Sequence, residues 1–196
     1  CVVDVPRLSD CHGVRSCHAT PTPSAPSSGR PASASIPLRA ASQRRIYAPL
    51  DMTAGFLETV RDTPLVADGA MGTQLYANGV LFTTNYDELC LSRPELVKRI
   101  HGEYLKSGAQ IIESNTFGAN RLTLGRHGFA DRAVEINKAG VSASLSAVHG
   151  TEVRVFASIG PTGVMLAMGE STPEELLSVF TEQATALAEA GAHGIV

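Results

Sequence analysis

The chain has 196 residues, a hydrophobic fraction of 43% and a formal net charge of −3. This length is enough for one domain with a substantial core, and no apolar run approaches the roughly 18 residues of a membrane span. The mildly acidic balance and the absence of tryptophan give no reason to expect a nucleic-acid or membrane partner.

The N-terminal 51 residues differ in composition from the rest. Residues 1–45 hold six arginines, two aspartates and no lysine or glutamate, so their charge is +4, whereas residues 46–196 carry −7. The run Thr20–Ser42 is almost entirely Pro, Ser, Ala, Thr and Arg and cannot bury enough apolar area to offset its ordering entropy. We predict that residues 1–51 are disordered. One interpretation is that translation starts at Met52, so that these residues lie upstream of a cytoplasmic protein. The other is that they form an organellar targeting peptide.

Cysteine usage gives no sign of a metal site or disulfide. Three of the four cysteines lie in the N-terminal segment, and Cys11 and Cys17 are each followed by histidine. Their spacing is not a standard zinc pairing, and no second half follows. Cys90 is the lone cysteine of the remaining chain and is interpreted as structural.

From Met52 onward, short apolar runs alternate with amphipathic segments. The apolar runs predict strands at Leu65–Asp68, Gln110–Ser114, Val153–Ser158 and His193–Val196. The amphipathic segments predict helices at Ala54–Arg61, from Ser92 to Gly108, at Asp131–Val148 and from Thr172 to near Gly191. Ser92 and Thr172 each begin a capping box, and a long loop covers Ala77–Leu91.

Strands and helices that alternate about every 40 residues predict βα units and a parallel sheet. Right-handed crossovers place the carboxyl ends of such strands on one face, where barrels and open α/β sheets bind ligands. Asp68, Asn115-Thr116 and Ser158–Gly160 should therefore lie together. A closed barrel needs about 200–250 residues, and 145 remain from Met52. The chain is thus a small open α/β domain or the first half of a barrel, and its end within a predicted strand favours the half-barrel.

Three motifs resemble those of a known family. They are Asp68-Gly69-Ala70-Met71-Gly72-Thr73, Glu113-Ser114-Asn115-Thr116-Phe117-Gly118-Ala119-Asn120 and Ala157-Ser158-Ile159-Gly160-Pro161. Their order and spacing resemble those of the homocysteine S-methyltransferase family, and the resemblance extends from Thr63 to Val196. It includes two further runs between the motifs, Arg93-Pro94-Glu95-Leu96-Val97 and Glu103-Tyr104-Leu105. The resemblance is strongest to the homocysteine-binding half of bacterial proteins fused to methylenetetrahydrofolate reductase and to the N-terminal module of cobalamin-dependent methionine synthase.

The resemblance implies a TIM (β/α)8 barrel, of which residues 52–196 would supply about three and a half βα units and end in the fourth strand. It implies zinc-dependent methyl transfer to the sulfur of homocysteine, giving methionine. The zinc ligands of the family are cysteines on later strands, expected beyond residue 196, so the chain alone should lack zinc and be inactive. The methyl donor would be methylcobalamin or methyltetrahydrofolate, S-methylmethionine or betaine, supplied directly or by a fused or partner domain.

The resemblance also assigns an amino-acid-binding site, but no catalytic residue, to this chain. The N–H groups of Gly69 and Ala70 would hold the substrate carboxylate, and Asp68 would fix the turn or meet the ammonium group. Glu113 would contact the ligand or fix neighbouring loops, and Phe117 would line the site or pack the barrel mouth. The predicted substrate-binding residues are Asp68, Gly69, Ala70, Glu113, Asn115, Thr116, Phe117, Ser158 and Gly160. No chemical role is given to the histidines His101, His127 and His149.

Two other interpretations stay open. The chain could belong to another βα-barrel enzyme, of the pterin-binding or aldolase type, which an isolated cysteine and a cysteine pair downstream would exclude. It could also be a non-catalytic half-barrel that associates with itself or with another chain through its open sheet edges. On the half-barrel interpretation, the isolated chain should be poorly soluble or oligomeric.

Overall fold

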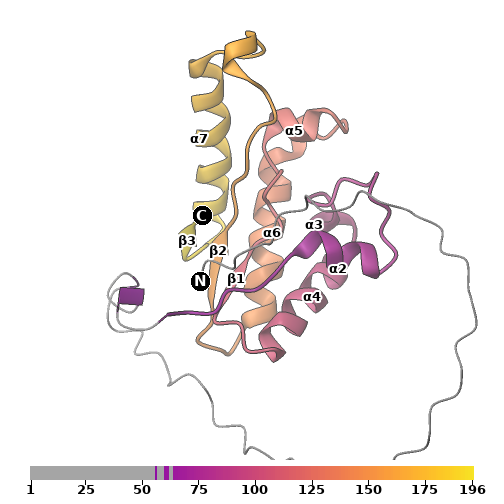
Figure 1. The fold of residues 1–196 in the computed structure, drawn as a ribbon, viewed down its shortest axis with the longest axis vertical. Helices are drawn as coiled ribbons and strands as arrows, with labels where there is room; N and C mark the ends of the chain where they lie inside the picture. The colour runs from indigo at the N-terminus through magenta and orange to yellow at the C-terminus, as the bar shows by residue number, and fades with distance from the viewer. Residues whose placement is uncertain (1–55, 57–59, 62–63) are drawn as a thin grey trace, which may run out of the picture. The chain divides into compact units, whose positions relative to one another are not determined.

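The computed structural model describes residues 56, 60, 61 and 64–196. Within them, helices alternate with short strands along the chain (Figure 1). The strands are β1 (Ile111–Glu113), β2 (Arg154–Ala157) and β3 (Gly194–Ile195). The α-helices are α2 (Met71–Ala77), α3 (Leu89–Ser92), α4 (Pro94–Lys106), α5 (Arg121–Gly125), α6 (Ala133–Val148) and α7 (Pro173–Glu189). Two 3₁₀ helices are η1 (Ala130–Arg132) and η2 (Leu166–Met168).

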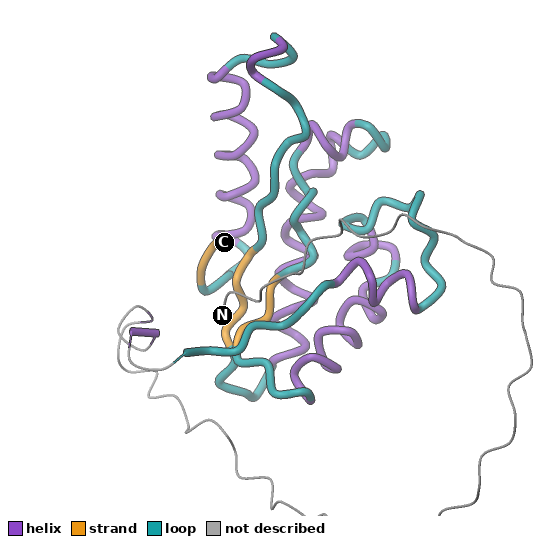
Figure 2. The backbone as a smooth tube through the Cα atoms, in the orientation of Figure 1, coloured by secondary structure: helices purple, strands orange, loops and turns teal. Residues whose placement is uncertain are grey.

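The three strands form one parallel sheet, as predicted, and their order is β1-β2-β3 (Figure 2). Ile112 of β1 lies opposite Val155 of β2, and Phe156 of β2 lies opposite Gly194 of β3. Strands that are consecutive in the chain are therefore neighbours in the sheet, joined by helical crossovers. This topology brings the carboxyl ends of the strands to one edge, where α/β proteins bind their ligands.

The predicted first strand, Leu65–Asp68, is reduced to a single parallel bridge between Ala67 and Ile111. The backbone of Val66 still accepts a hydrogen bond from the Gln110 N–H at 2.7 Å. On its other side, the Val66 N–H donates to the Gln110 side-chain oxygen at 3.1 Å. The Gln110 side chain thus takes the place of a backbone acceptor for the Val66 N–H. The regular ladder of backbone hydrogen bonds between strands therefore does not extend along Leu65–Asp68.

One of the two predicted helix caps is wrong. Ser92 is the last residue of α3, and its hydroxyl donates to the Glu88 carboxylate at 2.7 Å, so α4 begins without a side-chain cap. Thr172 does cap α7, because its hydroxyl oxygen accepts a hydrogen bond from the Glu175 N–H at 3.1 Å. The Glu175 carboxylate accepts from the Ser171 hydroxyl at 2.8 Å. The cap at Ser92 fails because a preceding turn of helix already uses that residue.

The sheet buries one face against the helices. Ile112, Val155 and Ala157 point toward this face and are fully buried with residues of α6 and α7. Phe156 points to the opposite face and is half-buried, with its ring 4.8 Å from that of Phe56 in an edge-to-face arrangement. The alternation expected of a strand therefore places the helix layer on one side of the sheet.

The predicted helix Asp131–Val148 is observed as η1 followed by α6. Predictions for residues 1–51 lie outside the described residues, as does most of the predicted helix Ala54–Arg61. None of the helices in the described part of the chain has the length and apolar character that a membrane crossing requires.

Candidate functional site

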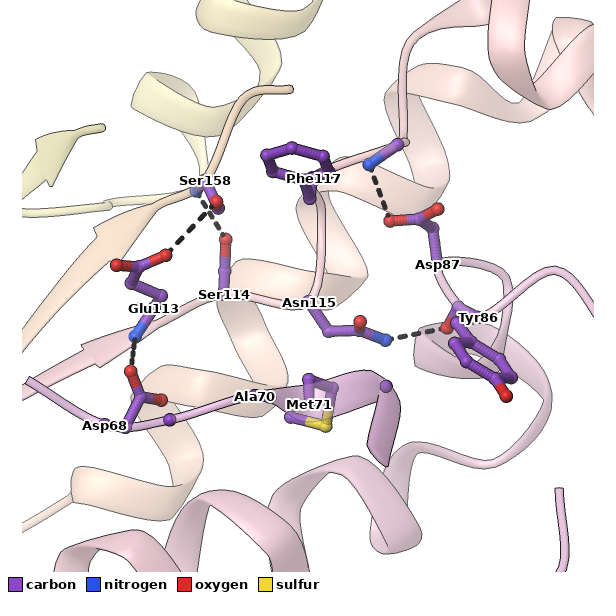
Figure 3. A pocket seen from close by; sticks show the side chains of 13 residues that line it. Asp68, Ala70, Met71, Tyr86, Asp87, Glu113, Ser114, Asn115, Phe117 and Ser158 are labelled. Atoms are coloured by element: carbon purple, nitrogen blue, oxygen red, sulfur yellow. Dashed lines mark hydrogen bonds between the residues drawn. The ribbon is translucent and has the colours of Figure 1, made fainter. Parts of the chain in front are cut away.

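A pocket of about 610 Å³ lies at the carboxyl ends of the strands (Figure 3). It brings together the turn that follows Ala67, the end of β1, the end of β2 and the loop between α2 and α3. Its lining residues are Asp68, Gly69, Ala70, Met71, Gly72, Tyr86, Asp87, Glu113, Ser114, Asn115, Phe117, Gly118 and Ser158. Seven of the nine predicted substrate-binding residues are among them.

The turn Asp68–Ala70 is held from two sides. One carboxylate oxygen of Asp68, Oδ1, accepts the Glu113 N–H at 3.1 Å, and the side chain is only 4% exposed. The Tyr104 hydroxyl, on α4, donates to the Ala70 carbonyl at 3.0 Å. A Cβ at Gly69 would lie 3.1 Å from that same phenol oxygen, so glycine permits the close approach. Asp68 and Tyr104 together fix the turn against β1 and α4.

Gly69 and Ala70 line the pocket and are exposed. In the described part of the chain, neither N–H has a hydrogen-bond acceptor. Buried or pocket-facing N–H groups are strong donors that are satisfied by protein, water or ligand. These two donors are therefore available to an anionic group of a ligand.

Hydroxyl groups connect the ends of β1 and β2. The Thr116 hydroxyl donates to the Ser158 carbonyl at 2.8 Å, and the Ser114 hydroxyl lies 2.6 Å from Thr116 Oγ1. Ser114 Oγ also accepts the Ser158 N–H at 3.2 Å. The Ser158 hydroxyl in turn donates to Glu113 Oε2 at 3.3 Å, which orients the carboxylate over the pocket (Figure 3). One oxygen of Glu113 thus binds the protein, and the other has no hydrogen-bond partner among the described residues.

Thr116 and Gly160, the other two predicted site residues, lie behind the lining. Thr116 is fully buried and uses its hydroxyl within the protein. Gly160 donates its N–H to the Phe117 carbonyl at 2.8 Å, and a Cβ at Gly160 would be 2.5 Å from the Phe117 ring. The ring is 59% exposed and rests on this glycine. Both residues shape the site from behind.

Six lining residues were not among the predicted substrate-binding residues: Met71, Gly72, Tyr86, Asp87, Ser114 and Gly118. Tyr86 and Asp87 lie outside the recognised motifs, in the predicted long loop. Asn115 donates its side-chain N–H to the Tyr86 carbonyl at 2.7 Å. The Gly118 N–H donates to Asp87 Oδ1 at 3.1 Å, and a Cβ at Gly118 would be 2.7 Å from Asp87 Oδ2. The acidic and aromatic residues of this loop were the available signal, but no periodicity indicates that the loop folds back onto β1.

Asp87 lines the pocket, and the pKa of its carboxyl group departs clearly from the ordinary value of an aspartate. Burial raises the pKa of its carboxyl from the ordinary 3.8 to about 6, although the Gly118 N–H and the nearby His127 oppose the shift. A carboxyl group with a raised pKa holds its proton longer in the folded than in the unfolded protein. Folding is therefore favoured by the protonated form.

This shift predicts a pH dependence of stability that Asp87→Asn removes. Between about pH 4 and about pH 6 the unfolded chain releases the Asp87 proton while the folded chain retains it, so the free energy of unfolding falls as pH rises. The asparagine keeps an oxygen for the Gly118 N–H. Urea unfolding of both proteins across this range should show the wild type losing stability relative to the variant, with a constant difference at higher pH. Parallel curves throughout would contradict the assignment.

Cys90 packs beneath the site rather than lining it. Its thiol donates to the Asn115 carbonyl at 3.3 Å, and the Asn115 side-chain N–H lies 3.5 Å from the sulfur. Burial raises the pKa of the thiol to about 12. The thiol therefore stays protonated and inert at neutral pH, which agrees with the interpretation of Cys90 as structural.

The described residues do not fit a zinc site. Within residues 64–196, no three histidine, cysteine, aspartate or glutamate side chains are grouped so that they could hold a metal ion. Cys90 has a protonated, buried thiol, and zinc requires thiolate.

The comparison with known sequences agrees with this geometry. Residues 65–196 match the family model of homocysteine S-methyltransferase. Methionine synthase from Mycobacterium tuberculosis is 29% identical over 151 residues, which cover 71% of this chain and 13% of that protein. Methionine synthase from Mycobacterium leprae is 30% identical over 152 residues, which cover 71% and 12%. The chain thus spans about an eighth of the length of these relatives.

A solved structure shares the fold. The crystal structure of the homocysteine methyltransferase MmuM from Escherichia coli, in its metallated form, is similar with a TM-score of 0.61 at 24% sequence identity. The match covers 71% of this chain and 55% of that chain. The family match extends over the whole of the sheet, the pocket and its three motifs. The chain belongs to the homocysteine S-methyltransferase family.

Proposed function

We propose that the pocket binds homocysteine, and that the protein to which these residues belong transfers a methyl group to its sulfur, giving methionine. The observation that carries this proposal is the turn Asp68–Ala70, whose two N–H donors lack acceptors in the described part of the chain. Gly69 and Ala70 line a pocket together with Glu113. An N–H pair beside a carboxylate is complementary to the carboxylate and ammonium groups of an amino acid.

Charge in the pocket supports a cationic group on the ligand. Asp68, Asp87 and Glu113 line it, and none of the described lining residues is lysine, arginine or histidine. Asp68 has one oxygen on the Glu113 N–H and is almost fully buried. Glu113 is exposed and keeps one oxygen free of the protein. We therefore place the substrate ammonium on Glu113, and leave Asp68 the task of fixing the turn.

We propose that the described sheet is part of a (β/α)8 barrel. The strand order follows the chain order, as in such barrels. The helices lie on one face of the sheet, whereas parallel sheets are ordinarily covered on both faces. In a barrel the second face becomes the packed interior. The likeness to MmuM, which extends over 55% of that chain, supports the same arrangement.

We further propose that zinc and the methyl donor are bound by other parts of the barrel or by other domains. Zinc, where bound, would favour the thiolate form of the substrate, which is the nucleophilic form. The family's cysteine ligands are expected on later strands than those described here. Methylcobalamin or methyltetrahydrofolate, S-methylmethionine or betaine would serve as donor, directly or from a fused or partner domain. The long methionine synthases, of which the chain matches 13%, leave room for such domains.

The binding proposal is tested by titrating the isotopically labelled 196-residue chain with homocysteine and recording amide shifts. The signals of Gly69, Ala70 and Glu113 should move together. Two analogues test the two halves of the site separately. 4-Mercaptobutanoate lacks the ammonium group and should still shift the amide signals of the turn. 3-Mercaptopropylamine lacks the carboxylate and should not shift them. Saturating homocysteine without a shift at the turn would refute the proposal.

Glu113→Gln should weaken homocysteine binding about tenfold, because the neutral amide replaces a charge-assisted hydrogen bond to the ammonium. The glutamine keeps an oxygen for the Ser158 hydroxyl, so the loop is preserved. Glu152→Gln, at an exposed position outside the pocket, removes the same charge and should leave the affinity unchanged. The dissociation constants come from the same titrations. An equal loss in both variants would point to overall charge instead of a contact.

A further inference from the structure

Beneath the turn lies a histidine to which the sequence assigned no role. His101 is on α4, and its side chain is completely buried behind the pocket. Its Nε2 lies 3.1 Å from the hydroxyl oxygen of Ser144 on α6. Its Nδ1 lies 3.8 Å from Asp68 Oδ2 and has no hydrogen-bond partner among the described residues. A buried ring nitrogen without a partner is costly and calls for an explanation.

The hydroxyl of Ser144 determines which nitrogen of His101 carries a proton. Ser144 Oγ lies 2.9 Å from the Gly140 carbonyl, and a carbonyl only accepts. The single hydroxyl proton therefore goes to Gly140, and Ser144 Oγ accepts from His101. Nε2 is thus the donor to Ser144 and bears a hydrogen.

The remaining nitrogen, Nδ1, faces the Asp68 carboxylate. If Nδ1 were bare, its lone pair would point at carboxylate Oδ2 in a site where both side chains are shielded from water, with exposures of 0% for His101 and 4% for Asp68. Two acceptors facing each other in such a place are unfavourable, whereas a proton between them satisfies both. The 3.8 Å separation is about 1 Å longer than a charge-assisted hydrogen bond and within the roughly 4 Å reach of an ion pair.

We propose that His101 Nδ1 carries a proton that it shares with Asp68 Oδ2, and that His101 is thereby a positioning residue for the Asp68–Ala70 turn. A relay of contacts then runs from Ser144 through His101 and Asp68 to the Glu113 N–H. The pair is neutral as a whole, which leaves Glu113 to meet a substrate ammonium. The part of this inference that concerns homocysteine rests on the proposed function, and the placement of the proton does not.

The proton is located by nitrogen NMR of the histidine rings in the 196-residue chain in neutral buffer. The His101 signals are identified among those of the six histidines by their loss in His101→Gln. We expect both ring nitrogens of His101 to carry a proton in the wild type. In Asp68→Asn the amide can donate to Nδ1, so Nδ1 should become a bare acceptor. A bare Nδ1 in the wild-type chain would overturn the proposal.

Two substitutions of His101 separate the contact to Asp68 from the contact to Ser144. An asparagine amide reaches the place of Nδ1 and keeps a donor for Asp68, whereas a glutamine amide reaches the place of Nε2 and keeps a donor for Ser144. We expect His101→Asn to bind homocysteine within about twofold of the wild type, and His101→Gln to bind about tenfold more weakly. Equal affinity in the two variants, or affinity that follows their melting temperatures, would show a merely structural role.

The two proposals fail in different ways. If the wild-type chain does not bind homocysteine, the proposed function is refuted, and the state of His101 Nδ1 still decides the placement of the proton. If His101→Gln does not fold, His101→Asn identifies the His101 signals instead, and the wild-type and Asp68→Asn spectra then decide the placement of the proton.

Discussion

Replacing Gly140 by alanine is expected to lower the free energy of unfolding by about 1–3 kcal/mol, although alanine is the better helix former. A Cβ at this buried position of α6 would overlap Thr116 Cγ2 and would lie 3.4 Å from both the Asn115 carbonyl and Cys90 Sγ. Thr116 has no freedom to yield, because its hydroxyl is bound to the Ser158 carbonyl. The steric cost outweighs the helix-propensity gain of about 1 kcal/mol.

Gly102 provides the matched control for this substitution. It lies within α4, and a Cβ there would meet nothing within 4 Å. Gly102→Ala should therefore raise the free energy of unfolding by up to about 1 kcal/mol. Urea unfolding of both variants beside the wild type measures the two effects with opposite signs. If Gly140→Ala were as stable as Gly102→Ala, the close packing of α6 on the loop after β1 would be refuted.

Asn137→Ala is expected to cost about 2–3 kcal/mol of stability, because it removes a buried amide and leaves the Ala119 carbonyl without its donor. The Asn137 amide on α6 donates to the Ala119 carbonyl at 2.6 Å and to the Ala133 carbonyl at 2.8 Å. Its oxygen accepts from Gln183 Nε2 at 3.3 Å, and Gln183 also donates to the Thr116 carbonyl at 2.9 Å. This buried amide pair joins α6 and α7 to the loop that carries Asn115 and Phe117 into the pocket.

The neighbouring residue Lys138 controls for a change in α6 itself. Its ion pair with Glu189, at 2.8 Å, joins two side chains that are 45% and 59% exposed. Lys138→Ala should therefore change stability by less than about 0.5 kcal/mol. Unfolding in urea gives the energies, and amide exchange in residues 115–120 shows whether that loop loosens in Asn137→Ala alone. Equal stability of the two variants would mean that the amide network contributes little.

Much of the architecture could be predicted because its signals are local. Apolar runs separated by helical patterns indicate βα units, and the handedness of crossovers then sets the parallel order observed for β1, β2 and β3. Thr172 caps α7 because a cap depends on residues within one turn. Ser92 does not cap α4, since a preceding helical turn engages its hydroxyl. Local patterns do not show which of two adjacent elements a residue will join.

The residues of the site likewise fall into those that local sequence patterns reveal and those that depend on contacts between distant residues. The glycine-containing turns after the strands, with Asp68, Glu113 and Ser158, are recognised from sequence because strand ends in a parallel sheet must meet. The contributions of Asp87 and His101 depend on contacts between residues distant in the chain: Asp87 reaches Gly118, and His101 lies between Asp68 and Ser144.

The sequence by itself determined the alternation of strands and helices and the face that carries the pocket, because both follow from residue order and from the geometry of parallel strands. The resemblance of its three motifs indicated the family. Only the tertiary structure decided which polar groups in that face are free and which are engaged. It buried the Asp68 carboxylate beside His101, left one oxygen of Glu113 without a partner among the described residues, and placed Thr116 and Gly160 behind the lining. Burial and hydrogen bonding between distant residues set these roles, and no local pattern encodes them.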